Sequence, residues 1–278
     1  MRIGGRTYKY RLSRLKDSLD PETVHIVMPV RNSIEITDIA IKCIKKYTKE
    51  PYVLWIVDND SNRDMQNYLS NIGGVNIIHN QSGVGTWYYP HWLIKHEGSF
   101  ANAISLELAA KFINGKYMFV MHNDTAPVNR NWLEYLKSKL NNDVKIAGVS
   151  QDKSRVEAVH NSGFLFDFEL YEKLNLNFMH NLPIYDVGDF ITIGLVAEGY
   201  KTYVCKNTFN NPETIDLINK GLYPDFIKNY SFDRSFNDMG EIIFMHLGRG
   251  TTRTKDSHPK KGYMKRSEWV EGMKRYFL

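Results

Sequence analysis

The sequence predicts an α/β protein with a Rossmann-like, mostly parallel central sheet and helices on both faces. Over the first 150 residues, short apolar runs rich in β-branched residues alternate with longer stretches whose apolar residues recur every three or four positions. The short runs indicate buried strands and the periodic stretches indicate helices. Because parallel strands need crossover helices, this alternation favours a parallel sheet. One main domain is the simplest interpretation of 278 residues.

The expected elements follow from these patterns. Strands are expected at residues 24–30, 53–57, 75–79, 117–121 and 144–149, with helices at 33–47, 65–72, 99–113 and 132–140. Asn32 or Ser33 is placed to cap the first helix. After residue 150 the pattern is less regular, with strands expected at 163–168 and 201–205 and a helix at 189–200. Residues 81–98 are expected to form a loop.

Charge and cysteine content indicate the kind of partner and the cellular compartment to expect. The net charge of +5 and the pI of about 8.9 suggest an anionic partner, which includes nucleic acid, a phosphorylated small molecule and a membrane surface. Only Cys43 and Cys205 are present, far apart, so a disulfide framework is not expected. With no apolar run long enough for a membrane span, we expect a cytoplasmic protein. Residues 1–23 read as a basic arm, either solvated or in contact with anionic lipid or nucleic acid.

Polar clusters follow several of the expected strands. Residues 58–62 come after the second strand, residues 122–125 after the strand at 117–121, and residues 186–189 precede a helix. The carboxyl ends of neighbouring parallel strands face one crevice, so residues distant in sequence can meet there. The sequence therefore predicts a site at this edge of the sheet.

Several short motifs occur in a recognisable order. They are PVRN at 29–32, VDNDS at 57–61, GSFANA at 98–103 and HND at 122–124. In this order and spacing the sequence resembles the family 2 glycosyltransferases, which have the GT-A fold. The resemblance covers residues 24–205 and extends to MHLGRGT at 245–251. It implies transfer of a sugar, with inversion, from a nucleotide-diphosphate sugar, with a UDP-type donor favoured, to an acceptor hydroxyl group.

The resemblance also implies where the donor binds. Asp58 corresponds to the acid that recognises the base, because a carboxylate can accept a hydrogen bond from a base N–H. Its alternative role is that of a turn residue after a strand. The residues implied in donor binding are Pro29, Val30, Arg31, Asn32, Asp58, Asn59, Gly83, Gly85, Asn102, His122, Asn123 and Arg249.

The HND turn corresponds to the metal motif of the family, with His122 in place of the first acid. By the resemblance, Asp124 ligates a divalent ion that clamps the diphosphate, and His246 is a further contact. Oxygen ligands suit Mg²⁺ or Mn²⁺, and an imidazole ligand shifts the preference to Mn²⁺. The alternatives are a strand-ending turn capped by Asp124 and a purely structural His246. Arg249 and Arg253 would fold over the diphosphate or remain solvated.

The catalytic base of the family is an acid on the acceptor side, and YDVGDF offers Asp186 and Asp189. The base would take the proton of the acceptor hydroxyl. Asp186 is preferred, and the alternative is that both are helix caps. The aromatic stretch at 86–92 either packs as a small core or forms a wall for a sugar or base.

The acceptor is left open between a glycan, a lipid-linked sugar and a modified nucleic acid, and peripheral membrane contact is compatible with the charge. Two rival functions remain. One is a catalytically inactive nucleotide-sugar-binding protein, suggested by His122 at the position of an acid. The other is a sugar-phosphate nucleotidyltransferase. The expected organisation is a basic arm at 1–23, a single GT-A domain at 24–248 with a donor half (24–150) and an acceptor half (151–248), and a basic segment at 249–278.

Overall fold

A computed structural model of the protein describes most of the chain. The described residues are 1–3, 6–13, 18, 20–82, 97–150, 156–208, 210–211, 213–221, 223–228, 232–248 and 264–278. Gly83, Gly85, Arg249, Arg253 and the aromatic stretch at 86–92 lie outside them, so the predictions made for these residues stay predictions.

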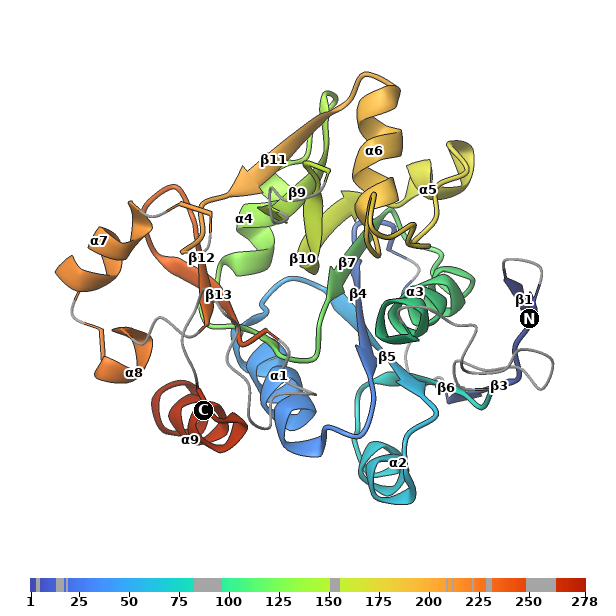
Figure 1. The fold of residues 1–278 in the computed structure, drawn as a ribbon, viewed down its shortest axis with the longest axis horizontal. Coiled ribbons are helices and arrows are strands. Elements are labelled where there is room, and N and C mark those ends of the chain that lie inside the picture. Colours follow the sequence, from blue (N-terminus) through green and yellow to red (C-terminus); the bar gives the residue numbers. More distant parts are fainter. Residues whose placement is uncertain are drawn as a thin grey trace.

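An eight-stranded sheet forms the centre of the molecule (Figure 1). Its strand order is β11 (Lys201–Cys205), β9 (Val144–Ser150), β10 (Val159–Asp167), β7 (Tyr117–Met121), β4 (Val24–Val30), β5 (Tyr52–Asn59), β6 (Asn76–Asn80) and β3 (Tyr10–Ser13). The four strands from β7 to β6 are parallel to one another, whereas β10 and β3 run antiparallel to their neighbours. The predicted mostly parallel sheet is confirmed, and each expected strand is present within a few residues.

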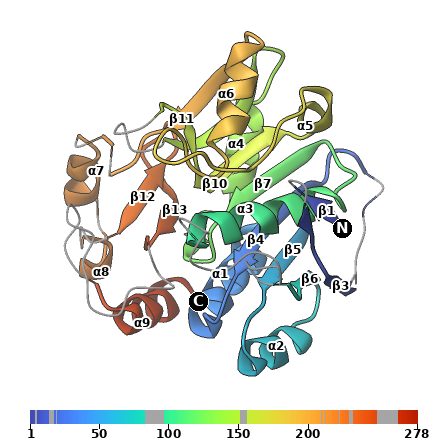
Figure 2. The same ribbon diagram turned by 45° about the vertical axis from the view of Figure 1, so that its right-hand side comes forward.

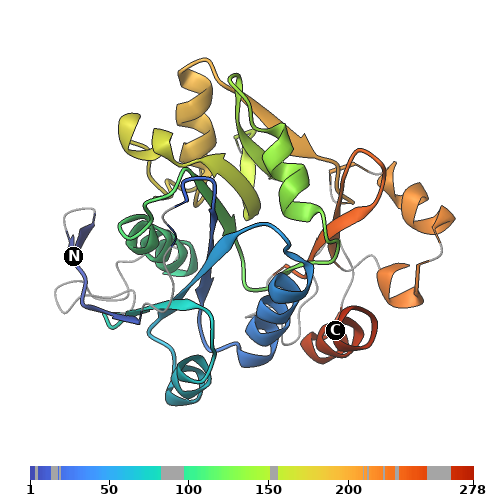
Figure 3. The ribbon, with the colours of Figure 1, turned by 180° about the vertical axis from the view of Figure 1, so that it is seen from behind.

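Helices cover both faces of this sheet. Alternate residues of β4 point to opposite sides, so that Ile26 joins the core under one set of helices and Val27 joins the other. One face carries α1 (Ile34–Tyr47), α2 (Arg63–Ser70) and α4 (Trp132–Lys139), seen in front of the sheet in Figure 3. The other face carries α3 (Glu97–Ala110), α5 (Glu169–Lys173) and α6 (Asp189–Ala197).

A second, three-stranded sheet lies beside the first (Figure 2). It joins β8 (Thr125–Pro127), directly after the HND turn, to β13 (Ile242–His246) and then β12 (Asp233–Phe236), all antiparallel. Its core includes one side of α1 and the helices α7 (Thr214–Lys220), α8 (Asp225–Lys228) and α9 (Arg266–Phe277). This sheet was not predicted from the sequence.

Both ends of the chain carry elements that the sequence did not reveal. Residues 2–3 and 6–7 pair as β1 (Arg2–Ile3) and β2 (Arg6–Thr7), and β3 forms the edge of the main sheet. At the other end, α9 buries Trp269 and Met273 against the second sheet. Ser33 occupies the N-cap position of α1, but its side chain makes no capping hydrogen bond. Within the described ranges, no helix is both long and apolar enough to cross a membrane.

Candidate metal and nucleotide site

The carboxyl ends of the parallel strands position the candidate site. Val30, the last residue of β4, lies opposite Asp58 near the end of β5. On the other side of β4, strand β7 ends at Met121 and passes directly into the HND turn. That turn is closed by a hydrogen bond of 3.1 Å from the backbone N–H of Thr125 to the carbonyl of His122. The first two polar clusters therefore lie at the same edge of the sheet, on either side of the end of β4.

The second sheet brings His246 to Asp124. His246 at the end of β13 is paired with Thr125 of β8, and the backbone N–H of Leu247 donates to the carbonyl oxygen of Asp124 (3.0 Å). As a result, His246 Nε2 lies 3.4 Å and His122 Nδ1 lies 3.9 Å from Asp124 Oδ1. His122, Asp124 and His246 each offer one ligand atom, and these atoms lie within 4.8 Å of one another.

Burial and charge decide the state of the two imidazoles. Burial lowers the pKa of His122 to about 4, although the carboxylate of Asp124 acts in the opposite direction. For His246, burial also acts to lower the pKa, but Asp124 and Asp233 outweigh it and raise the pKa to about 9. His122 is therefore neutral at neutral pH and has a lone pair to share. His246 lies between two carboxylates, with Nδ1 3.6 Å from Asp233 Oδ2.

This cluster fits a divalent metal ion. The side chain of Asp124 is 5% exposed, and His246 Nε2 is buried without a hydrogen bond to any described residue. A buried polar atom without a hydrogen bond is costly in a native protein, and a metal ion would satisfy it. Two imidazole nitrogens and one carboxylate oxygen form a donor set that first-row metal ions accept more readily than Mg²⁺, which prefers oxygen.

Two amide side chains lie next to this cluster. Asn102 on α3 places Nδ2 3.5 Å from His122 Nε2, so the GSFANA motif reaches the HND turn. Asn123 is 7% exposed and donates to the hydroxyl of Thr37 on α1 at 3.2 Å. Of the two, Asn102 therefore contacts the histidine cluster, while Asn123 fixes the turn to a helix.

The predicted base-binding region is a dense hydrogen-bond network. Asp58 is 1% exposed, and its two carboxylate oxygens contact His79 Nδ1 at 2.9 Å and the backbone N–H of Ser61 at 3.2 Å. Asn32 accepts a hydrogen bond from the backbone N–H of Asn62 at 2.7 Å, which fixes the PVRN turn to the segment after β5.

Other predicted residues take defined places around this network. Asn32 adopts a left-handed backbone conformation with φ of 49°, which asparagine tolerates better than most residues. Asn59 accepts from Asn80 Nδ2 at 2.6 Å. Val30 is buried, Pro29 half-buried and Arg31 exposed.

The two candidate bases differ in their surroundings. Asp189, the first residue of α6, is fully buried, and its Oδ2 accepts from the backbone N–H of Asp186 at 2.7 Å. This is the arrangement of an acid that holds the first turn of a helix. Asp186 is half-buried, and its negative charge acts on both His122 and His160.

His160 and Asp233 lie next to the cluster but are not among the residues predicted from the sequence. The ring of His160 lies 5.5 Å from that of His122 and 6.1 Å from that of His246. Asp233 lies opposite His246 in the β12–β13 pairing. Neither position is marked by a local motif, because both depend on antiparallel pairings between distant segments.

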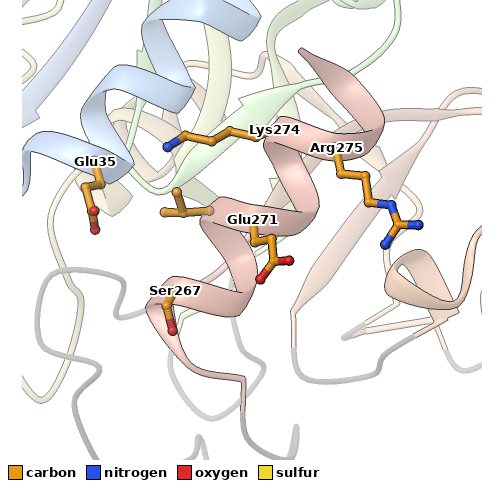
Figure 4. A pocket seen from close by; sticks show the side chains of 6 residues that line it. Glu35, Ser267, Glu271, Lys274 and Arg275 are labelled. Atoms are coloured by element: carbon orange, nitrogen blue, oxygen red, sulfur yellow. The ribbon is translucent and has the colours of Figure 1, made fainter.

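A separate hollow of about 480 Å³ lies between the start of α1 and α9 (Figure 4). Its lining includes Glu35 from α1 and Ser267, Glu271, Lys274 and Arg275 from α9. Of the predicted site residues that the structure describes, none lines it. Charged side chains of both signs surround it, so it has no clear preference for a cation or an anion.

Comparison with solved structures identifies the fold. The mannosyltransferase PcManGT from Pyrobaculum calidifontis, solved with GDP-Man and Mn²⁺, matches with a TM-score of 0.50 and 14% identity over 69% of this chain and 58% of that one. TarS 1-349 from S. aureus, with UDP-GlcNAc, gives 0.41 and 11% over 56% and 48%. Glucosyl-3-phosphoglycerate synthase from Mycobacterium tuberculosis, with Mn²⁺, UDP and glucosyl-3-phosphoglycerate, gives 0.39 and 12% over 55% and 59%.

The first of these matches, together with the sheet order, shows that the chain has the GT-A fold. The chain spans less than two thirds of the length of each of the three proteins. No protein-family model and no curated protein sequence matches it. The likeness is therefore one of fold, and the activity has to be argued from the site.

Proposed function

We propose that the protein is a metal-dependent glycosyltransferase that moves a sugar from a nucleotide-diphosphate sugar to an acceptor hydroxyl group, with inversion. The observation that carries this proposal is the His122–Asp124–His246 cluster at the carboxyl end of β7. In an open α/β sheet this edge is where ligands bind. The GT-A fold supports the choice of substrate, since the mannosyltransferase of that fold was solved with GDP-Man and Mn²⁺.

Each region of the site has a task in this proposal. Asp58, oriented by His79, accepts a hydrogen bond from the base of the donor, and the turn at 29–32 lines the same pocket. His122, Asp124 and His246 hold the metal. A bound divalent ion would neutralise the diphosphate as it leaves. Mn²⁺ is our first choice of metal, because two of the three proposed ligands are imidazoles. A UDP-type donor is our first choice of substrate, as the family resemblance implies.

Asp186 is the proposed general base. A base has to reach the proton of the acceptor hydroxyl, so it needs some exposure to the crevice. Asp186 has that exposure and lies close enough to the histidines for its charge to act on them, whereas Asp189 is fully buried and bonded to the backbone of Asp186. A single base that activates the acceptor for direct attack gives inversion at the anomeric carbon.

Donor hydrolysis tests the proposal. The full chain would be incubated with a panel of UDP- and GDP-sugars, with Mn²⁺ or Mg²⁺ and with EDTA, and the released diphosphate would be measured. We expect turnover with one donor class, its loss in EDTA, and its loss in Asp124→Ala. Turnover that survives both changes would exclude the metal role. Donor binding without turnover on any glycan, lipid-linked or nucleic-acid acceptor would instead support an inactive binding protein.

A further inference from the structure

His160 lies beside the metal cluster because β10 runs past the end of β7. The last pair between these antiparallel strands joins Met121 of β7 to Gly163 of β10. The residues of β10 that precede Gly163 therefore continue beyond β7, alongside the HND turn. A hydrogen bond of 2.7 Å from the hydroxyl of Thr125 to the carbonyl of Ser162 ties the two segments together.

The same part of β10 is irregular. Its pairing with β9 shifts register between Val159 and Phe164. Such irregularities re-aim side chains and are common next to active sites. Here the shift covers residues 160–162, which lie beside the turn: the carbonyl of Ser162 bonds to Thr125, and the side chain of Asn161 bonds to His122. The ring of His160 stays half-buried and lies 5.5 Å from that of His122.

The hydrogen bonds of His160 fix which nitrogen carries the proton. The backbone N–H of Ser162 donates to His160 Nδ1 at 3.2 Å, so Nδ1 has to be an acceptor. The hydroxyl of Ser162 lies 2.7 Å from the same nitrogen and completes the contact. A neutral imidazole has one N–H, and since Nδ1 has none, Nε2 carries it. His160 is therefore a hydrogen-bond donor at Nε2.

This separates His160 from the other two histidines of the cluster. A histidine binds a metal ion through the lone pair of a ring nitrogen, after the ion has displaced any proton there. In His160 the nitrogen that has the lone pair is already bonded to Ser162. The three atoms that approach one another as a ligand group come from His122, Asp124 and His246. His160 thus adds an N–H donor at the edge of a site whose other side chains are suited to hold a cation.

We propose that His160 donates a hydrogen bond from Nε2 to the diphosphate of the nucleotide-sugar donor. This inference rests on the proposed function, in which the diphosphate lies against the metal ligands. Diphosphate oxygens accept hydrogen bonds and never donate them, and charge accumulates on them as the sugar leaves. Because Ser162 already holds the His160 ring in place, its Nε2–H group can stabilise that charge without reorganisation.

Two amide variants test the inference. The amide of Asn reaches the position of Nδ1, so His160→Asn keeps the contact with Ser162 and removes the donor at Nε2. The longer His160→Gln puts an amide N–H near the position of Nε2. For the full chain with Mn²⁺, calorimetric titration would measure the affinities for UDP, GDP and the matching nucleosides, and Mn²⁺ binding would be measured separately.

We expect His160→Asn to weaken diphosphate binding about 10-fold or more, the usual effect of a lost hydrogen bond to a charged group. Nucleoside binding and Mn²⁺ affinity should stay within about twofold, and His160→Gln should recover most of the loss. Unchanged diphosphate binding in a folded His160→Asn protein would overturn the inference. So would a large loss of Mn²⁺ affinity, because it would make His160 a ligand.

The wild-type titration separates this result from a failure of the proposed function. If the wild-type chain binds Mn²⁺ and a nucleoside diphosphate, the proposed site stands and only the variants decide the role of His160. If it binds neither, both ideas fail together. Thermal unfolding of each variant checks that it is folded. If His160→Asn is not folded, His160→Phe takes its place in the comparison with His160→Gln, because it also lacks the N–H group at Nε2.

Discussion

Two buried polar clusters lie at the carboxyl ends of β5 and β7, which are separated by β4, and they are built in opposite ways. Around Asp58, each carboxylate oxygen has a hydrogen-bond partner within 3.2 Å, and both partners belong to the protein. Around Asp124, the imidazole nitrogens of His122 and His246 stand 3.9 Å and 3.4 Å from one carboxylate oxygen. The first cluster is held together by short hydrogen bonds, and the second gathers ligand atoms at the longer distances of ion pairs.

The difference separates a cluster that stabilises the fold from one suited to a cation. A satisfied buried network is rigid and contributes to stability, so the Asp58 region is formed before any ligand arrives. Ligand atoms that converge without hydrogen bonds gain most from an ion that contacts all of them. Variants in the first region should therefore lower stability as well as binding of the nucleotide base, and variants in the second should mainly lower metal binding and turnover.

The largest effect is expected at the metal ligands. His246→Ala removes one of three ligands, and we expect donor turnover to fall on the order of 10²–10³-fold, the range seen when one group that stabilises developing charge is removed. The rise in melting temperature on adding Mn²⁺ should also be lost, because a bound ion stabilises the folded state by mass action.

The matched control for His246→Ala is His79→Ala, which removes a buried histidine from the other cluster. The control should keep the shift in melting temperature produced by Mn²⁺. Loss of that shift in both variants would show that the two clusters are not independent, and its survival in His246→Ala would remove this residue from the ligand set.

The next largest effect is expected on stability at Asp58. Asp58→Ala leaves the ring of His79 and the backbone N–H of Ser61 buried without their partner. An unsatisfied buried group costs about 1–3 kcal/mol, so the free energy of unfolding should fall by roughly 2–5 kcal/mol. Denaturant unfolding of Asp58→Ala, His79→Ala and the double variant would measure the loss in free energy of unfolding and the coupling between the two residues. A coupling energy near zero between Asp58 and His79 would contradict the network.

Asp233 sharpens the comparison because we expect it to support the proposed ligand His246 without being a ligand itself. It faces His246 Nδ1 at 3.6 Å, and carboxylates behind a metal-binding histidine orient the ring. We expect Asp233→Asn to weaken Mn²⁺ binding about 10-fold, at the low end of the usual range for such residues. Asp233→Ala should weaken it further. Titration with Mn²⁺ measures both, and equal affinity in Asp233→Ala and the wild type would remove this role.

The positions of Asp58 and of the HND turn were predicted from the sequence for the same reason, whereas His246 was named only through the family resemblance. The strands β4, β5 and β7 are continuous apolar runs that end in polar residues, and parallel strands place those ends at one edge. Asp58 and Asp124 therefore follow from local pattern and sheet direction alone. The order of the motifs predicted the GT-A fold, and the match to a solved structure with a TM-score of 0.50 confirms this prediction.

The rest of the site depends on pairings that no local pattern reveals. His246 meets Asp124 only because β13 pairs with β8, a strand of three residues that reads as a turn in the sequence. His160 meets His122 because β10 is antiparallel and irregular where it passes β7. Among the helices, α9 was missed because residues 249–278 were interpreted as one basic segment, although Trp269, Val270 and Met273 form an apolar side within it.

A smaller effect is expected at the cap of α2, which borders the Asp58 network. The side chain of Asn62 accepts from the backbone N–H of Met65 at 3.0 Å, and its backbone N–H donates to Asn32. Asn62→Ala loses only the first contact, so the free energy of unfolding should fall by about 1 kcal/mol. Asn62→Asp keeps a capping oxygen and should remain close to the wild type in denaturant unfolding. An equal loss of unfolding free energy in Asn62→Ala and Asn62→Asp would show that the capping hydrogen bond is not its cause.

The smallest effect is expected where a carboxylate is exposed. Hydrogen bonds from Lys139, Tyr203 and Tyr135 lower the pKa of Asp238 to about 2, yet its side chain is 62% exposed. Because the pKa is lower in the folded state, this contribution to stability is present above about pH 4 and is lost as the pH falls towards 2. Solvent screening keeps it below about 1 kcal/mol. The unfolding free energies of wild type and Asp238→Asn should therefore converge as the pH is lowered, and a gap that widens in acid would contradict the assignment.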